Sequence, residues 1–161
     1  MQFPHTYFED EIREGFYITG AMKRAWAAQL EVLEEIDKVC KKHNIRWFAD
    51  CGTLLGAVRH GGYIPWDDDM DICMLRPDYI KFNQVAEQEL PKSFVVLNMH
   101  KEELYLEYMT RVTNGHRLNF DSNYLEKYHD CPYATGIDIF VLDYIAEDEE
   151  EEKKVSLEQV A

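Results

Sequence analysis

The chain has 161 residues, of which 46% are hydrophobic and 13% aromatic, and its formal net charge at pH 7 is −14. This composition is typical of one globular domain with a buried core and excludes a disordered chain. No run of Lys or Arg is longer than a pair, which argues against a nucleic-acid partner. A phosphate-containing ligand would therefore need a metal ion or a local arginine.

The N-terminal residues contain no apolar segment typical of a signal peptide, and no apolar stretch approaches the length of a membrane span. We therefore expect a cytoplasmic protein without a membrane span. The cysteines form no Cys-x-x-Cys pair and predict reduced, mostly buried thiols rather than a zinc site or a disulfide scaffold. They are Cys40, Cys51, Cys73 and Cys131.

The clearest predicted helix lies in the first half of the chain, at residues 21–44. Apolar side chains recur there at three- and four-residue steps, which is typical of a helix with one buried face. They are Met22, Trp26, Leu30, Leu33, Ile36 and Cys40. A short strand at 45–51, helical turns over 53–60, a Gly/Pro loop at 61–66 and a strand at 69–74 are expected to follow.

The second half predicts a helix over 76–90, bounded by Pro77 in its first turn and Pro91 after its end. Strands are expected at 93–98, 104–113 and 135–145. Between them, Asn114-Gly115 predicts a turn, after which 116–120 could return as a hairpin strand, and a helix is expected from residue 147. This order indicates an α/β (α+β) fold, a mixed β-sheet flanked by helices, as a single domain over 1–161.

Four of the five residues from 67 to 71 are aspartates, and the sequence then turns apolar. If the strand starts at residue 69, Asp69 and Asp71 point to one face, and Met70, Ile72 and Met74 point to the other. Two carboxylates with Cβ atoms about 6.5–7 Å apart can converge on hard divalent cations. Asp67 has the same parity and could join through water, whereas Asp68 should face away and be dispensable.

Asp138 lies between Ile137 and Ile139 in a second predicted strand. Taken alone, such an acid is as often an edge or surface charge as a ligand. Together with Asp69 and Asp71, it is better interpreted as a third metal carboxylate.

The Gly52-Thr53 turn comes between a predicted strand and a short helix. Backbone N–H groups at such a turn can hold phosphate. Arg59 falls on the same helix face as Thr53 and is suited to clamp a phosphate group. The pattern is weak by itself, since glycine is common at such turns, and gains weight from the aspartates that follow.

Other interpretations of the acidic run fit less well. An EF-hand loop would require glycine where Ile72 stands. A D-x-D glycosyltransferase would place a nucleotide-binding half ahead of the motif, where only about two short elements precede it here. A solvated turn would explain the acids but not the apolar residues that alternate with them.

Residues 51–72, CGTLLGAVRHGGYIPWDDDMDI, closely resemble the signature of the LicD/fukutin-type phosphotransferases of the nucleotidyltransferase superfold. The preceding LEVLEEIDKVCKKHNIRWFAD and the later GIDIFVLDYI are similar too, so the resemblance covers about residues 21–150. It implies that Asp69, Asp71 and Asp138 are catalytic and bind Mg²⁺ or Mn²⁺. Asp67, on the same parity, stays a further candidate ligand from the pattern alone. The resemblance also implies that Gly52, Thr53 and Arg59 hold phosphate oxygens.

The resemblance implies transfer of a phospho-alcohol, such as phosphocholine or ribitol phosphate, from a CDP-linked donor to a sugar of a cell-surface glycan, with release of CMP. The acceptor glycans that the resemblance implies are lipopolysaccharide and teichoic acid. The alternatives are a nucleotidyltransferase that releases pyrophosphate and a non-catalytic nucleotide- or glycan-binding module.

Two further expectations concern the length of the chain and its aromatic residues. Chains of this family usually continue well past the third aspartate, so we expect either a fragment truncated at its C-terminus or a short paralogue. Tyr63, Trp66, Tyr105 and Tyr108 are candidates for an aromatic cage around a quaternary ammonium, although aromatic residues are more often part of the core.

Overall fold

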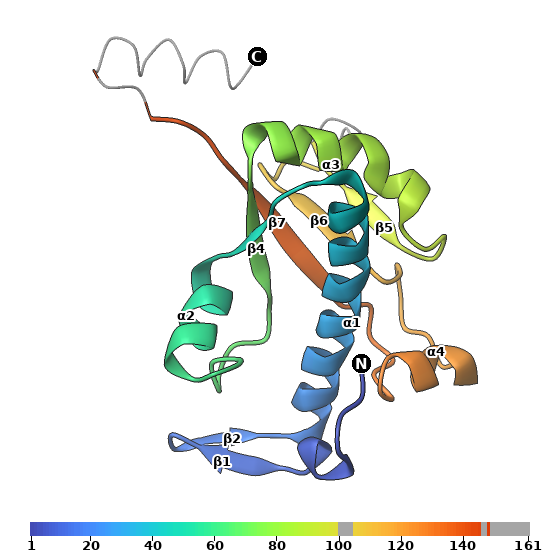
Figure 1. Ribbon diagram of the computed structural model, residues 1–161. Coiled ribbons are helices and arrows are strands. Elements are labelled where there is room, and N and C mark those ends of the chain that lie inside the picture. The colour runs from blue at the N-terminus through green and yellow to red at the C-terminus, as the bar shows by residue number, and fades with distance from the viewer. Residues whose placement is uncertain (100–104, 146–147, 149–161) are drawn as a thin grey trace.

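The computed structural model describes residues 1–99, 105–145 and 148 (Figure 1). The first elements are the 3₁₀ helix η1 (His5–Phe8), strands β1 (Glu11–Arg13) and β2 (Phe16–Ile18), helix α1 (Gly20–His43), strand β3 (Phe48–Ala49) and helix α2 (Cys51–Arg59). They are followed by β4 (Asp71–Leu75), α3 (Arg76–Glu89), β5 (Val95–Leu97), β6 (Thr110–Thr113), α4 (Ser122–Lys127) and β7 (Gly136–Leu142).

Five strands form one mixed sheet in the order β3-β4-β7-β6-β5. Strands β4 and β7 are parallel, and the other neighbouring pairs are antiparallel. Strands β1 and β2 form a separate hairpin beside the first turns of α1 (Figure 1). The predicted α+β fold with a mixed sheet flanked by helices is confirmed.

Helices α1 and α3 pack on the face of the sheet that carries the core (Figure 1). Ile72 and Met74 of β4, Ile137 and Ile139 of β7 and Val112 of β6 are fully buried against them. Because side chains alternate along a strand, Asp71, Asp138 and Arg111 point to the opposite face. The alternation of acidic and apolar residues thus places the acids at the surface of a sheet whose other face is buried.

Helix α1 begins and ends close to where the sequence predicts. Thr19 precedes its first turn and accepts a hydrogen bond from the Met22 N–H at 3.2 Å. Asn44 ends the helix in the left-handed conformation, with φ of 52°. In the described ranges, no helix combines the length and the apolar character needed to cross a membrane.

Several predicted boundaries are wrong. Strand β4 begins at Asp71 rather than at 69, and residues 67–70 have no regular structure. Strand β3 contains only Phe48–Ala49 of the predicted 45–51. Strand β6 begins at Thr110 rather than at 104, which lies outside the described residues. No strand forms at 116–120, where the chain leads instead into α4.

The β1–β2 hairpin was not predicted. Its turn places Glu14 and Gly15 at φ of 52° and 81°, as a tight two-residue hairpin requires. Glutamate is unusual at such a position, so the turn lacks the typical Asn-Gly or Asp-Gly signal. The helix expected from residue 147 lies outside the described residues.

Candidate active site

A row of charged side chains crosses the sheet at the start of β4. Asp71 of β4 lies opposite Asp138 of β7, and Asp138 lies opposite Arg111 of β6. Asp50 continues the row past the end of β3, where its N–H donates to the Asp71 carbonyl at 3.1 Å. Residues opposite one another on neighbouring strands point to the same face, so three carboxylates and one guanidinium gather there.

Asp138 is held by a two-point ion pair with Arg111. Arg111 Nε donates to Oδ1 at 2.6 Å, and Nη2 donates to Oδ2 at 2.7 Å. The charge of Asp138 is therefore neutralised within the described structure. Arg111 was not among the predicted site residues, because only the antiparallel pairing of β6 with β7 brings it to Asp138.

Asp71 forms no ion pair with a cation among the described residues, and its pKa is raised from 3.8 to about 6. Burial of the carboxyl is the largest cause, followed by the negative charges of Asp69, Asp138, Asp67 and Asp50. Excess negative charge thus remains at Asp71. A divalent cation would relieve it, and carboxylate oxygens are the ligands that hard cations prefer.

The acidic loop, defined as residues 67–69, provides a second group of carboxylates. One oxygen each from Asp67, Asp68 and Asp69 lies within 4.8 Å of the others. The prediction that Asp68 faces away from its neighbours is wrong. Strand parity separates side chains only within a strand, and β4 begins two residues after this loop.

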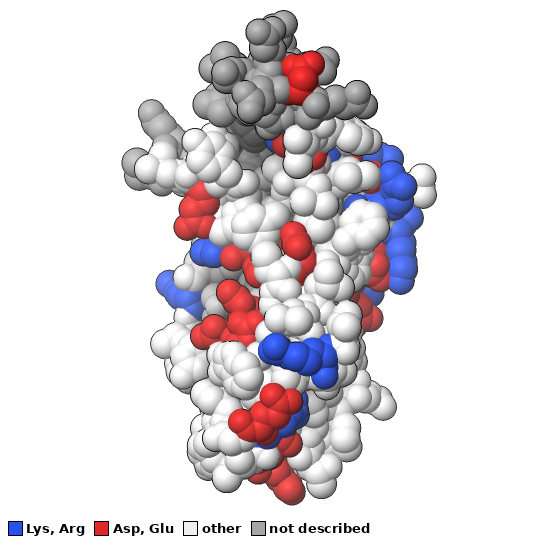
Figure 2. Space-filling view, turned by 90° about the vertical axis from the view of Figure 1, so that its left-hand side faces the viewer, with Lys and Arg blue, Asp and Glu red and all other residues white. Residues whose placement is uncertain are grey.

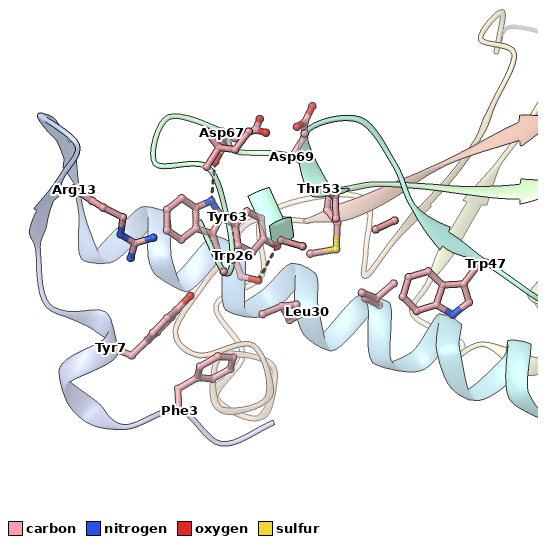
Figure 3. Close-up of a pocket in the computed structure, with 18 residues that line it drawn as sticks. Phe3, Tyr7, Arg13, Trp26, Leu30, Trp47, Thr53, Tyr63, Asp67 and Asp69 are labelled. Carbon is pink, nitrogen blue, oxygen red and sulfur yellow. Dashed lines mark hydrogen bonds between the residues drawn. The ribbon is translucent and has the colours of Figure 1, made fainter. Parts of the chain in front are cut away.

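Side chains of α1 hold the acidic loop through hydrogen bonds to its main-chain carbonyl groups (Figure 3). Trp26 Nε1 donates to the Asp67 carbonyl at 2.9 Å, and Gln29 Nε2 donates to the Asp68 carbonyl at 2.8 Å. Tyr63 stacks on Trp26 at 4.8 Å between ring centroids, and its hydroxyl donates to Gln29 Oε1 at 2.9 Å. Trp26 therefore does more than fill the core, since it also fixes the main chain that carries the carboxylates.

The N-terminal turn of α2 lies directly against these acids. The Thr53 hydroxyl accepts a hydrogen bond from the Asp71 N–H at 2.8 Å, which ties α2 to the first residue of β4. A Cβ atom at position 52 would overlap Oδ2 of Asp67, so glycine is needed for that carboxylate to approach the helix. Cys51 has φ of 43°, a left-handed conformation that strains a residue other than glycine.

Arg59 is placed away from this group. It lies at the C-terminal end of α2, whereas Gly52 and Thr53 lie in its first turn, about 10 Å away along a helix of this length. Its Nε donates to His60 Nε2 at 2.7 Å, and its guanidinium lies 6.0 Å from the centroid of the Trp66 ring. Its predicted phosphate contact stays a prediction.

A cavity of about 420 Å³ lies between α1, α2 and the loop that precedes β4 (Figure 3). Its walls are mainly aromatic and aliphatic, and Gly52, Thr53, Asp67 and Asp69 also line it. Tyr63 is the one member of the predicted aromatic cage among the lining residues. Trp66 and Tyr108 are instead exposed.

Acidic side chains gather on the side of the molecule that carries α2 and β4 (Figure 2).

Residues 44–154 match the family model described as the LicD/FKTN/FKRP nucleotidyltransferase domain, which covers more than half of the chain. The chain belongs to this LicD family. The resemblance of residues 51–72 and of the Asp138 strand is thereby confirmed at the level of the family.

Curated relatives match shorter segments. A 60-residue segment is 43% identical to the lipopolysaccharide cholinephosphotransferase LicD of Haemophilus influenzae, and it spans 37% of this chain and 23% of that protein. An uncharacterized protein of Rickettsia prowazekii is 34% identical over 87 residues, which are 54% of this chain and 32% of that protein. An uncharacterized Rickettsia typhi protein is 43% identical over 58 residues, 36% of this chain and 19% of that protein. The matches thus span no more than about a third of each relative.

Within this LicD-family domain, the structure gathers five of the predicted site residues, Gly52, Thr53, Asp69, Asp71 and Asp138, together with the additional candidate Asp67. It adds residues that the sequence did not mark, namely Trp26, Gln29, Asp50, Asp68 and Arg111. Asp50 could have been suspected from its place at the end of a strand just before Gly52. Trp26 and Gln29 have no such signal, because their roles depend on tertiary contacts with the acidic loop.

If these carboxylates bind Mn²⁺, Gly52→Ala is expected to weaken that binding about tenfold without lowering the melting temperature. The new methyl group displaces the Asp67 carboxylate, while alanine favours the helical backbone at this position. Mn²⁺ titration followed by electron paramagnetic resonance, with a thermal melt of the same sample, measures both effects. Gly62→Ala is the matched control, since nothing lies within 4 Å of its added Cβ. Equal Mn²⁺ affinities in the two variants would contradict the predicted contact.

Proposed function

We propose that the chain is the metal- and nucleotide-binding domain of a phosphotransferase. In this proposal it moves a phospho-alcohol, such as phosphocholine, from a CDP-linked donor to a sugar of a cell-surface glycan and releases CMP. The observation that carries the proposal is the register of Asp71 with Asp138, beside the Gly52-Thr53 turn, in a chain of the LicD family. The cholinephosphotransferase name of the Haemophilus influenzae relative supports the choice of donor.

The residues fit a divalent cation such as Mg²⁺ or Mn²⁺. In this proposal Asp69 and Asp71, with Asp138 and Asp67, would hold it through oxygen atoms. One oxygen each of Asp67, Asp68 and Asp69 already lies within 4.8 Å of the others, and Asp71 and Asp138 lie opposite each other on β4 and β7. When bound, such an ion neutralises diphosphate charge and polarises the phosphorus to be attacked. The raised pKa of Asp71 supports this assignment, because burial and then the charges of the neighbouring carboxylates disfavour its ionised form, which a bound cation would stabilise.

The remaining chemistry is positioning and proton transfer. The acceptor hydroxyl oxygen forms a bond to the phosphorus that carries the alcohol, and the bond from that phosphorus to the CMP oxygen breaks. The hydroxyl proton passes to a carboxylate of the row, and CMP leaves with the electron pair of the broken bond. Thr53 holds α2 against β4, so the helix N-terminus faces the place where the diphosphate would lie.

The second candidate is a nucleotidyltransferase that releases pyrophosphate. The family description supports it, since it names a nucleotidyltransferase domain. The same carboxylates would serve, but the attack would occur at the α-phosphorus of a nucleoside triphosphate. The two reactions therefore differ in their released product.

The deciding experiment measures CMP release from CDP-choline and CDP-ribitol with a glycan acceptor, with and without Mg²⁺. Pyrophosphate release from CTP and ATP is measured in parallel. We expect Mg²⁺-dependent CMP release that falls at least about 100-fold in Asp69→Asn. Asp143→Asn is a suitable control, because Asp143 forms its ion pair with Arg76 beyond the end of β7. Pyrophosphate release without CMP release would favour the second candidate.

A wild-type protein that binds CDP with Mg²⁺ but releases neither product would instead indicate a binding module. Ligand binding would then raise the melting temperature without turnover. Activity that is unchanged in Asp69→Asn would remove the proposed role of the acidic loop.

A further inference from the structure

Arg111 is a cation placed at the end of a row of carboxylates. Its side chain is 39% exposed, whereas that of its partner Asp138 is 16% exposed. The two contacts from Nε and Nη2 fix the guanidinium side-on to the carboxylate. The orientation of the Asp138 carboxylate is therefore fixed, on the strand that lies between those of Asp71 and Arg111.

The pairing leaves part of the guanidinium available. Nη1 donates to no acceptor within residues 1–99, 105–145 and 148, and the Glu107 carboxylate lies 3.9 Å from Nη2. An arginine that shares its Nε edge with a carboxylate can still donate from Nη1 to an anionic oxygen. Arg111 can thus hold Asp138 and contact a ligand at the same time.

A second donor near this pair also lacks a partner. The hydroxyl of Tyr105 is buried and has no hydrogen-bond partner in the described part of the chain. Burial and the charge of Glu107 raise the pKa of Tyr105, and the charges of Arg111 and Asp138 also act on this hydroxyl. A buried hydroxyl without a partner costs free energy, and an acceptor atom from a ligand would remove that cost.

Building on the proposed function, we infer that Arg111 is the cation that binds a diphosphate oxygen at this site. Its Nη1 would donate to the oxygen, while Nε and Nη2 keep their two hydrogen bonds to the Asp138 carboxylate. The sequence suggested this role for Arg59, which instead bonds to His60 at the far end of α2. In a chain of net charge −14, a guanidinium among the acids offsets the repulsion between them and a phosphate group.

Replacing Arg111 should change metal and diphosphate binding in opposite directions. Arg111→Gln removes a positive charge beside Asp71 and Asp138, so Mn²⁺ alone should bind as tightly as in the wild type or more tightly. The same change removes a charge-assisted hydrogen bond to the diphosphate. We therefore expect about 10- to 100-fold weaker binding of CDP at saturating Mn²⁺.

The experiment uses the full chain and two measurements. Mn²⁺ binding is followed by electron paramagnetic resonance, and CDP binding at saturating Mn²⁺ by isothermal titration calorimetry, with cytidine as a ligand that lacks phosphate. Arg111→Lys keeps the charge without the forked geometry and should show an intermediate loss of CDP affinity. Arg46→Gln is the control, because Arg46 is 71% exposed and pairs with Asp78 of α3.

The inference is overturned if wild-type protein binds no CDP with Mn²⁺, or if CDP affinity in Arg111→Gln stays within about threefold of wild type. It is also overturned if both Arg111 variants lose Mn²⁺ and CDP affinity in parallel, which would indicate a purely structural ion pair. CMP release is assayed separately. If it is absent while the opposite changes in binding persist, the proposed transfer reaction fails and the role of Arg111 stands.

Discussion

Asp71→Asn is expected to make the protein more stable at pH 8 and to abolish the divalent-metal binding that we propose. The carboxylate is partly buried among Asp69, Asp138, Asp67 and Asp50, and its pKa is raised to about 6. In its ionised form it destabilises the folded state by about 1–2 kcal/mol, after allowance for partial solvent exposure. Asparagine has nearly the same shape and removes that cost, while the backbone N–H bond to Thr53 is kept.

The gain in stability should depend on pH. The pKa of Asp71 is higher in the folded than in the unfolded chain, so between pH 3.8 and about 6 the folded state binds more protons. The contribution of this group to stability therefore falls as pH rises through that range and is constant above it. The difference between Asp71→Asn and wild type should accordingly be full at pH 8 and largely gone near pH 4.

Urea denaturation at pH 8 and at pH 4.5, with and without Mn²⁺, measures this effect. Mn²⁺ should stabilise the wild type and not the variant. Asp130→Asn removes the same charge from an exposed pair with Arg24 and should show neither change. A variant of Asp71 that is less stable than wild type at pH 8 would contradict the predicted charge repulsion.

Trp26→Ala is expected to destabilise the protein by about 3–5 kcal/mol, which is the usual cost of deleting a buried large aromatic side chain. Trp26 is 2% exposed, stacks on Tyr63 and donates to the Asp67 carbonyl. Trp26→Phe keeps most of the buried ring and loses the donor, so we expect a cost of about 1–2 kcal/mol. Because the acidic loop is then held less firmly, Mn²⁺ affinity should also fall, by about tenfold.

Trp47→Phe is a matched control for this prediction. Trp47 lines the same cavity, but its Nε1 donates to the Asp37 carboxylate of α1 at 3.1 Å and not to the acidic loop. This variant should lose stability and keep its Mn²⁺ affinity. Denaturation curves and Mn²⁺ titrations of both Phe variants provide the comparison. The same loss of Mn²⁺ affinity in both variants would show that the loop does not depend on Trp26.

The revised position of Asp68 shows where reasoning from sequence pattern failed. The alternation Met70, Ile72, Met74 correctly identifies the buried face, because these residues enter the core beneath α1 and α3. Extending the same parity back to Asp68 is wrong, because the chain is not a strand before Asp71. Pattern rules apply only within an element, and element ends are where sequence signals are weakest.

The sequence by itself determined the fold class, the long first helix, the local pairing of Gly52-Thr53 with the acidic run, and membership of the LicD family. These features depend on hydrophobic periodicity and on residues close together in the chain. Only the tertiary structure decided that Arg111 neutralises Asp138, that Asp71 has no comparable partner in the described part of the chain, and that Trp26 and Gln29 hold the acidic loop. The hydrogen bonds of Arg111, Trp26 and Gln29 join residues that are 27 to 41 positions apart in the chain. The surroundings of Asp71 depend on which strands are neighbours in the sheet, and no local sequence pattern determines strand order.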